Sequence, residues 1–295
     1  MKKTLSVLLV LLLVLSLTAC GGNDEIEIES PNGASNNGDS GNNTPKPQKA
    51  EISETVLYDG NGVKITAKGL DMDGFMGPEL KLTIENNSGK SLTIQDRDTS
   101  VNGYMVDSGM SVDVANGKVA NDSVTFMNTS LELCGIHSFA TIELSFTAFD
   151  SESWDDYFTT EPITLNTSIA ESYTDTADHS GQVAYEADGI KIVIKGLTDD
   201  ASILGESIVV YAENNSGANI TVQSKDVSIN GIMVDPIFSC DVLSGKRTVD
   251  TITFMSSELE ENGITDIADI ELVFHIFNAD SWEDITDTDV VTINF

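Results

Sequence analysis

Hydrophobic and polar residues alternate with a period of two in several segments of the chain. Residues 80–85 read Leu-Lys-Leu-Thr-Ile-Glu, and residues 142–148 read Ile-Glu-Leu-Ser-Phe-Thr-Ala. Because successive side chains of a strand point to opposite faces, each segment predicts a strand with one apolar face. Strands of this kind form antiparallel sheets that pack apolar face to apolar face.

The alternation returns about 128 residues later because the chain contains an internal duplication. VKITAKGL at 63–70 matches IKIVIKGL at 190–197, ENNSG at 85–89 matches 213–217, SVNGYMVD at 100–107 matches SINGIMVD at 228–235, TFM at 125–127 matches 253–255, and Ser-Trp at 153–154 matches 281–282. A period this long is that of a whole domain rather than of a solenoid repeat. We therefore predict two β-sandwich domains, residues 53–167 and 182–295, joined by a linker at 168–181.

Turn residues support this interpretation. Asn102-Gly103 and Asn230-Gly231 each separate two strand-like segments. Asn-Gly is typical of two-residue hairpins because a type I′ turn needs positive φ at both central residues. The Asn-Asn-Ser-Gly segment predicts a second, looser reversal in each copy.

One helical turn is expected in each copy. Ser257 to Glu260 has the spacing of a capping box, and Gly263 follows as a helix stop. Residues 129–132, followed by Gly135, repeat the pattern. The expected fold class is therefore all-β, two tandem immunoglobulin-like antiparallel β-sandwich domains with one short helical turn each.

The repeated motifs resemble those of a known group of proteins. IENNSG at 84–89, SVNGYMVD at 100–107 and FNADSW at 277–282 are similar to a repeat found in secreted and lipid-anchored proteins of Gram-positive Firmicutes. The resemblance covers both copies and implies immunoglobulin-like sandwiches outside the cytoplasm. It carries no catalytic or binding residue over to this chain, because the family has no established site.

The first residues have the pattern of an export signal. Two lysines at positions 2 and 3 precede an apolar run from Val7 to Leu15, which is too short to span a bilayer. The segment Leu17-Thr18-Ala19-Cys20 then resembles the bacterial lipobox. The resemblance implies a lipoprotein signal peptide at residues 1–19 and lipidation of Cys20, with the chain held at the cell membrane and facing outside the cytoplasm.

The next segment differs in composition. Residues 20–52 are rich in Asn, Gly, Ser and Pro, and the large aliphatic residues up to Lys49 are Ile26 and Ile28. So little apolar surface does not offset the entropy of ordering the backbone. We predict that this segment is a disordered tether between the lipidated Cys20 and the first domain.

The net charge of −33 limits the classes of partner. A protein without a basic patch does not neutralise phosphates, so nucleic acid is not an expected partner. Anionic lipid headgroups are equally unfavourable, and we expect contact with the membrane only through the lipid anchor. Acidity of this kind favours solubility and is compatible with Ca²⁺ binding. We expect a monomer.

Cysteines and histidines give no sign of a catalytic or metal centre. Cys134 and Cys240 lie at non-equivalent positions of the repeat, and we take them as two isolated thiols, with a single inter-domain disulfide as the alternative. His137, His179 and His275 lie in three different contexts. The sequence has no HExxH, CxxC or GxSxG motif, so we expect a protein without enzymatic activity.

Two acidic segments at equivalent positions are the candidate sites. They contain Asp150, Glu152, Asp155 and Asp156 in the first copy, and Asp280, Glu283 and Asp284 in the second. Carboxylates gathered in a loop can bind Ca²⁺, which takes six to eight oxygen ligands, although the spacing is not that of an EF-hand. The alternative is a solvated acidic loop.

Each acidic segment contains one of the two tryptophans, Trp154 and Trp282. An exposed tryptophan beside carboxylates can stack on a sugar ring. A tryptophan at the end of a strand is more often half-buried at the edge of a core, and we expect that role first.

These observations predict a non-catalytic, membrane-anchored lipoprotein. It would display two modules for binding or adhesion, or as a spacer, with an unknown surface protein or glycan as partner. Duplication raises avidity when both copies engage one target. A carbohydrate- or Ca²⁺-binding module is the alternative. An unrecognised hydrolase, or a solute-binding lipoprotein with two α/β lobes, agrees less well with the pattern.

Overall fold

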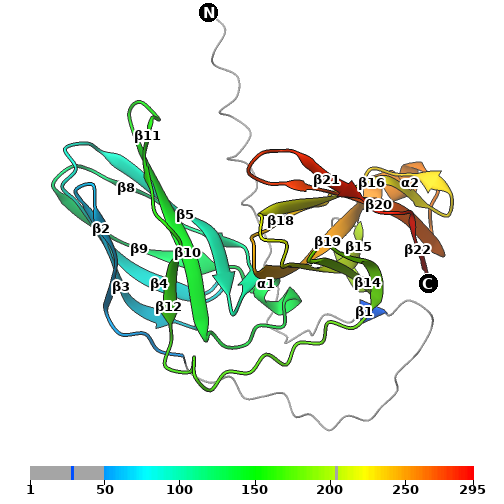
Figure 1. The fold of residues 1–295 in the computed structure, drawn as a ribbon, viewed down its shortest axis with the longest axis horizontal. Coiled ribbons are helices and arrows are strands. Elements are labelled where there is room, and N and C mark those ends of the chain that lie inside the picture. The colour runs from blue at the N-terminus through cyan, green and yellow to red at the C-terminus, as the bar shows by residue number, and fades with distance from the viewer. Residues whose placement is uncertain (1–27, 30–49, 203–204) are drawn as a thin grey trace, which may run out of the picture.

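The computed structural model describes residues 28–29, 50–202 and 205–295, and within these ranges the chain is almost entirely β-structure with two short helices. Figure 1 shows two β-modules side by side, the first drawn blue to green and the second olive to red. The predicted all-β fold with one short helix in each copy is confirmed.

The first module contains two sheets, and every strand pairing within it is antiparallel. Its strands are β2 (Thr55–Gly60), β3 (Val63–Asp71), β4 (Glu79–Asn86), β5 (Leu92–Val101), β6 (Tyr104–Met105), β7 (Ser108–Gly109), β8 (Ser111–Val114), β9 (Lys118–Phe126), β10 (Thr141–Asp150), β11 (Asp156–Thr159) and β12 (Ile163–Asn166). One sheet has the order β2-β3-β4-β9-β7. In the other, β5 pairs with β6, β8 and β10, and β10 also pairs with β11 and β12.

The second module repeats this arrangement. Its strands are β13 (Gln182–Ala187), β14 (Ile190–Ser202), β15 (Gly205–Asn214), β16 (Ile220–Ile229), β17 (Ile232–Met233), β18 (Ser239–Val242), β19 (Lys246–Met255), β20 (Asp269–Asn278), β21 (Asp284–Asp287) and β22 (Val291–Asn294). One sheet contains β13-β14-β15-β19. The other contains β16 with β17, β18 and β20, and β20 with β21 and β22.

The alternating positions predicted to be apolar line the cores. Leu80, Leu82 and Ile84 of β4 are fully buried, as are their counterparts on β15. The four inward residues of β10 and of β20 are also fully buried, namely Ile142, Leu144, Phe146, Ala148, Ile270, Leu272, Phe274 and Ile276. Burial of a large apolar side chain contributes roughly 1.5–3 kcal/mol, so these faces hold the sheets of each module together.

The Asn-Gly hairpins have the predicted geometry. Asn102 and Gly103 have φ of 53° and 84°, and Asn230 and Gly231 have φ of 50° and 76°. Positive φ at both central residues is the mark of a type I′ turn. In the first module the Asn102 side chain also bonds to the backbone of residues 138, 140 and 141, and Asn230 repeats the pattern with residues 266, 268 and 269.

The short helices end as predicted but begin differently. Helix α1 (Asn128–Leu133) and helix α2 (Ser256–Glu261) are each followed by a glycine with positive φ, Gly135 and Gly263. In both, the backbone bonds are those of a Schellman motif. The capping-box prediction is wrong, because the N-cap residues are Met127 and Met255, with no side-chain cap.

A buried asparagine holds the looser reversal in each module. Asn86 is fully buried, donates from Nδ2 to the carbonyl oxygens of Lys90 and Val114, and accepts from the backbone N–H and hydroxyl of Ser88. Asn214 makes the four corresponding bonds. The Asn-Asn-Ser-Gly segment is therefore a structural motif.

Part of the segment predicted to be a disordered tether is a strand. Ile28–Glu29 form β1, which pairs antiparallel with Leu197 and Thr198 of β14. Strand β13 pairs with residues 190–194 of β14, and β1 continues the same edge at Leu197 and Thr198. The remaining residues before 50 lie outside the described ranges, and so does Cys20.

The two modules meet through a continuous sheet. Strand β6 of the first module pairs in parallel with β19 of the second, at Tyr104 and Arg247. Four apolar residues on the outer face of β14, β15 and β19 are buried in the hydrophobic cluster of the first module: Val193, Val209, Tyr211 and Val249. We call these four residues the covered face. The sequence did not predict this packed contact between the modules.

Candidate functional site

The predicted acidic residues lie on two equivalent hairpin loops, between β10 and β11 and between β20 and β21. Asp150 ends β10, and its carboxylate accepts from the backbone N–H groups of Glu152 and Ser153. Asn278 ends β20 and accepts in the same way from the N–H groups of Asp280 and Ser281. The first polar residue of each loop therefore holds the turn.

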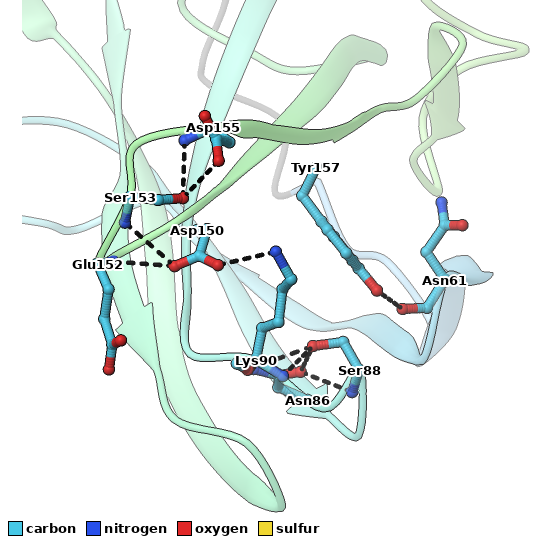
Figure 2. A network of polar contacts seen from close by, with 9 residues as sticks. All are labelled: Asn61, Asn86, Ser88, Lys90, Asp150, Glu152, Ser153, Asp155 and Tyr157. Atoms are coloured by element: carbon cyan, nitrogen blue, oxygen red, sulfur yellow. Dashed lines mark hydrogen bonds and ion pairs between the residues drawn. The ribbon is translucent and has the colours of Figure 1, made fainter.

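Lys90 joins the first-module loop to the neighbouring reversal, as Figure 2 shows. Its Nζ lies 2.9 Å from Asp150 Oδ2 and 5.8 Å from the ring centroid of Tyr157. The Tyr157 hydroxyl donates to the carbonyl oxygen of Asn61 at 3.2 Å. The side chain of Glu152 points away from this network (Figure 2).

The ion pair between Lys90 and Asp150 shifts the pKa of both groups. The hydrogen bond from Lys90, together with the two backbone N–H groups, holds the pKa of Asp150 below its usual value. The same carboxylate raises the pKa of Lys90. The Lys90 side chain is 47% exposed and that of Asp150 is 14% exposed. Because the lysine reaches the carboxylate from the solvent side, the pair contributes little to stability. Asp150 is thus charged and already occupied by donors.

Both tryptophans are exposed, at 71% for Trp154 and 75% for Trp282. Each occupies a left-handed backbone conformation, with φ of 65° and 62°. Trp154 stacks on Phe149 at a centroid distance of 5.3 Å, and Trp282 stacks on Phe277 at 5.7 Å, both with 20° between the planes. A neighbouring phenylalanine therefore supports each indole.

The expectation that these tryptophans are half-buried at the core edge is wrong. The hairpin loop leaves each indole exposed, and the phenylalanine on which it stacks is half-buried in the first module and buried in the second. A bulky residue in the left-handed region carries a strain of about 1–3 kcal/mol. Glycine or asparagine would adopt this conformation at lower cost. The chain therefore presents an aromatic ring at a position where the backbone disfavours one, in both modules.

The surroundings of the second tryptophan differ from those of the first. His275 stands in place of Thr147, with Nδ1 2.8 Å from Asp287 Oδ1 and Nε2 3.5 Å from Asp284 Oδ1. Lys225 also pairs with Asp287. The His275 ring lies 5.4 Å from that of Phe277. The second loop thus combines an exposed indole with an imidazole and two carboxylates.

The remaining predicted acidic residues do not converge on one point. Asp155 accepts from the Ser153 hydroxyl at 2.8 Å, and Asp280 lies 3.3 Å from the Asn219 amide. Asp156 and Glu283 are exposed. Within the described ranges, no group of three or more His, Cys, Asp or Glu side chains is arranged to hold a metal ion. The geometry gives the Ca²⁺ interpretation no preformed ligand shell.

Sequence reasoning missed a polar cluster at the contact between the modules. The Tyr104 hydroxyl lies 2.9 Å from Asp175 Oδ2 and 2.8 Å from His179 Nε2. Arg247 pairs with the same aspartate at 2.6 Å and lies over the Tyr104 ring at 4.2 Å. His179 stacks on Tyr211, with 4.3 Å between centroids. Two linker residues are therefore part of the contact.

Burial sets the protonation states in this cluster. Burial raises the pKa of Tyr104 and, together with the positive charge of Arg247, lowers the pKa of His179. Burial also acts to raise the pKa of Asp175, but hydrogen bonds from the Ala177 N–H and Tyr104, with the charge of Arg247, outweigh it and lower the pKa. The cluster is thus built for a charged aspartate and a neutral histidine.

The two other cysteines are free and buried, as the isolated-thiol interpretation predicts. Cys134 lies at the contact between the modules, with its sulfur 3.9 Å from the carbonyl oxygen of Val249. Burial raises its pKa to about 12 and raises that of Cys240 well above its usual value. None of the helices in the described ranges has the length and apolarity needed to cross a membrane.

Comparisons with known proteins add little. No protein-family model matches the chain, and no curated protein matches it. Among solved structures, the chain is similar to the crystal structure of the YadV chaperone, with 10% identity, 72% of this chain and 91% of that chain covered, and a TM-score of 0.24. It is also similar to red sea bream transglutaminase, with 10% identity, 83% and 30% covered, and a TM-score of 0.20. Likeness this distant carries no information about function.

Proposed function

We propose that this chain is a lipid-anchored protein of the cell membrane that displays two immunoglobulin-like modules outside the cytoplasm and binds its target through the two tryptophan hairpins, without catalysis. The anchor rests on the sequence Leu17-Thr18-Ala19-Cys20. The binding role rests on one observation, the exposed indoles of Trp154 and Trp282 at equivalent positions.

Each tryptophan hairpin combines an apolar ring with polar groups, as a small amphipathic binding site requires. One side of the indole packs on a phenylalanine, and the high exposure leaves much of the ring accessible. Carboxylates and a basic group lie close by: Asp150 and Lys90 in the first module, and Asp287 and Lys225 in the second. Flat apolar surface beside hydrogen-bonding groups suits a sugar ring, which has a C–H face and a rim of hydroxyls.

The contact between the modules supports two-point binding. Because β6 pairs with β19 and Arg247 bridges to Asp175, the two hairpins are presented at a fixed spacing. A rigid pair of weak sites gains avidity when the target repeats at a matching distance. The expected targets are therefore repeating polymers, foremost the glycans of a cell wall or a host surface.

The test is a glycan array probed with the exported chain and with Trp154→Gly, Trp282→Gly and the double variant. Glycine suits the left-handed backbone at both positions, so these variants remove the ring without straining the fold. We expect each single variant to weaken binding roughly tenfold or more and the double variant to abolish it. Binding that is equal in the double variant and the parent contradicts the tryptophan sites.

A spacer is the second candidate function, and the rigid contact between the modules favours it. A spacer needs fixed geometry but no ligand. If arrays and pull-downs with cell-wall polymers and host proteins show no partner for the full chain, the spacer role takes precedence. The anchor is tested separately, because Cys20→Ala is expected to release the chain from the membrane fraction and to remove the lipid from its mass spectrum.

A further inference from the structure

The contact between the modules has two halves, and the duplication provides a counterpart of each. One half is the first-module tip, Asn102–Met105, which contains the Asn-Gly hairpin. The Arg247 N–H donates to the carbonyl oxygen of Gly103 at 3.1 Å, and the Thr248 hydroxyl donates to that of Met105 at 3.3 Å. The other half is the covered face of the second module.

Among the described residues, nothing covers the counterpart of the first half. The second-module tip, Asn230–Met233, has the same type I′ hairpin and the same short strand, β17. Ile232 is 38% exposed and Met233 is 63% exposed, whereas their counterparts Tyr104 and Met105 are fully buried and half-buried. Gly231 is exposed as well. Its carbonyl oxygen can therefore accept a hydrogen bond from a partner strand, as the carbonyl oxygen of Gly103 accepts one from the Arg247 N–H.

The counterpart of the covered face is polar. Val193, Val209, Tyr211 and Val249 correspond to Thr66, Lys81, Thr83 and Asn121 on the outer face of the first module. Lys81 is already paired with Glu79. A second copy of this chain therefore does not offer the apolar face that the second-module tip would need, and open-ended self-association is not expected.

We propose that the second-module tip is a docking surface for a β-sandwich module of another protein, one that presents an apolar outer sheet face and a basic edge strand. The first module supplies the template, because its own tip is covered in this way by β15 and β19. Edge-strand pairing provides main-chain hydrogen bonds, and the apolar face covers the exposed hydrophobic side chains.

Charge defines the partner further. In the contact within the chain, Glu143 pairs with Lys246 at 2.6 Å. The counterpart of Glu143 is Glu271, which is exposed. Asp235 and Asp266 near the second-module tip are exposed too. An acidic rim around an apolar centre selects a partner with lysine or arginine at the edge of its sheet.

The test uses a variant of the chain itself as the partner. The probe carries Thr66→Val, Lys81→Val, Thr83→Tyr and Asn121→Val, which reproduce the covered face on the first module. It also carries Met233→Asp, which blocks its own tip. Lys118 of the probe already occupies the position that corresponds to Lys246. Sedimentation velocity then measures binding of this probe to the parent chain and to the parent carrying Met233→Asp.

We expect a one-to-one complex between probe and parent, and at least a tenfold loss of affinity when the parent carries Met233→Asp. No complex with a folded probe overturns the proposal, as does a complex that Met233→Asp leaves unchanged. Circular dichroism and a thermal melt establish that the probe is folded. If it is not, the probe with only Lys81→Val, Thr83→Tyr and Met233→Asp takes its place, and the same two outcomes decide. The tryptophan hairpins are untouched, so the result is independent of the glycan arrays.

Discussion

The outer face of β3, β4 and β9 in the first module and that of β14, β15 and β19 in the second occupy equivalent positions of the duplicated sequence but carry opposite chemistry. In the first, Lys81 and Thr83 are half-exposed, Asn121 is exposed and Thr66 is buried. In the second, the four corresponding residues are apolar and covered by the first module. The inward residues of both copies remain apolar throughout. The side chains of the two copies therefore differ on the outer face, where only the second module is covered by the other. They are alike on the inner face, which forms the core of each module.

The largest expected effect comes from a charge placed on the covered face. Val209→Asp should lower the free energy of unfolding by about 3–5 kcal/mol, because it leaves an uncompensated carboxylate in an apolar contact. The matched change in the first module is Lys81→Asp, where the side chain is 44% exposed, and it should cost about 1 kcal/mol or less. Urea unfolding of both variants measures the difference. Equal costs would mean that the two faces are not in different environments.

Replacing the buried asparagines should, in contrast, lower the free energy of unfolding by the same amount in both modules. Asn86→Ala and Asn214→Ala each leave two carbonyl oxygens without their donor. Each should cost about 1–3 kcal/mol. Chemical denaturation of the two variants checks this. A difference of more than about 1 kcal/mol between them would show that the equivalence of the two reversals is incomplete.

Acid should loosen the contact between the modules. His179 and Asp175 both have lowered pKa values in the folded chain, so the unfolded chain binds more protons. The stability that they contribute is present at neutral pH and is lost as the pH falls, first below the usual histidine value of 6.5 and then below the usual aspartate value of 3.8. Urea unfolding between pH 7.5 and pH 4 measures this loss.

Two histidine variants separate this effect from the general behaviour of so acidic a chain. His179→Gln should flatten the pH dependence between pH 7 and pH 5.5. His137→Gln, at an exposed position of the first module, should leave it as it is. Identical pH profiles for these two variants would assign the acid sensitivity to other groups.

The smallest expected effect on stability is at the tryptophan hairpins. Replacing Trp154 or Trp282 with glycine relieves about 1 kcal/mol or more of left-handed strain and removes a stacking contact of about 0.5–1.5 kcal/mol. The net change should stay within about 1 kcal/mol in either module. Thermal melts of both variants check it. A loss of several kcal/mol would mean that the rings close the core, as the sequence alone suggested.

Much of each module was predictable because its determinants are local. The alternation in residues 80–85 and 142–148 depends only on which face a strand buries, and Asn102-Gly103 specifies its turn through positive φ at two adjacent residues. Because the sequence is duplicated, each of these local patterns occurs twice, and the two occurrences support the same prediction. The prediction of the helix N-caps was wrong because a methionine, rather than a residue with a hydroxyl or carboxylate side chain, precedes each helix.

The tryptophan exposure and the inter-module contact were not predictable in the same way. Whether an indole turns inward depends on the left-handed conformation at Trp154, which no propensity of tryptophan indicates. The contact left a trace in the sequence, since Val209 and Tyr211 break the polar side of an alternating strand where Lys81 and Thr83 keep it. Comparing the two copies at their outward positions would have identified the covered face.

The pairing of Ile28 and Glu29 with β14 has a consequence for orientation. Eight residue steps separate Cys20 from Ile28, which at full extension span about 30 Å. If Cys20 carries lipid, as proposed above, the first described residues after it are attached to β14 of the second module, although that module comes later in the chain than the first, which begins at Ala50.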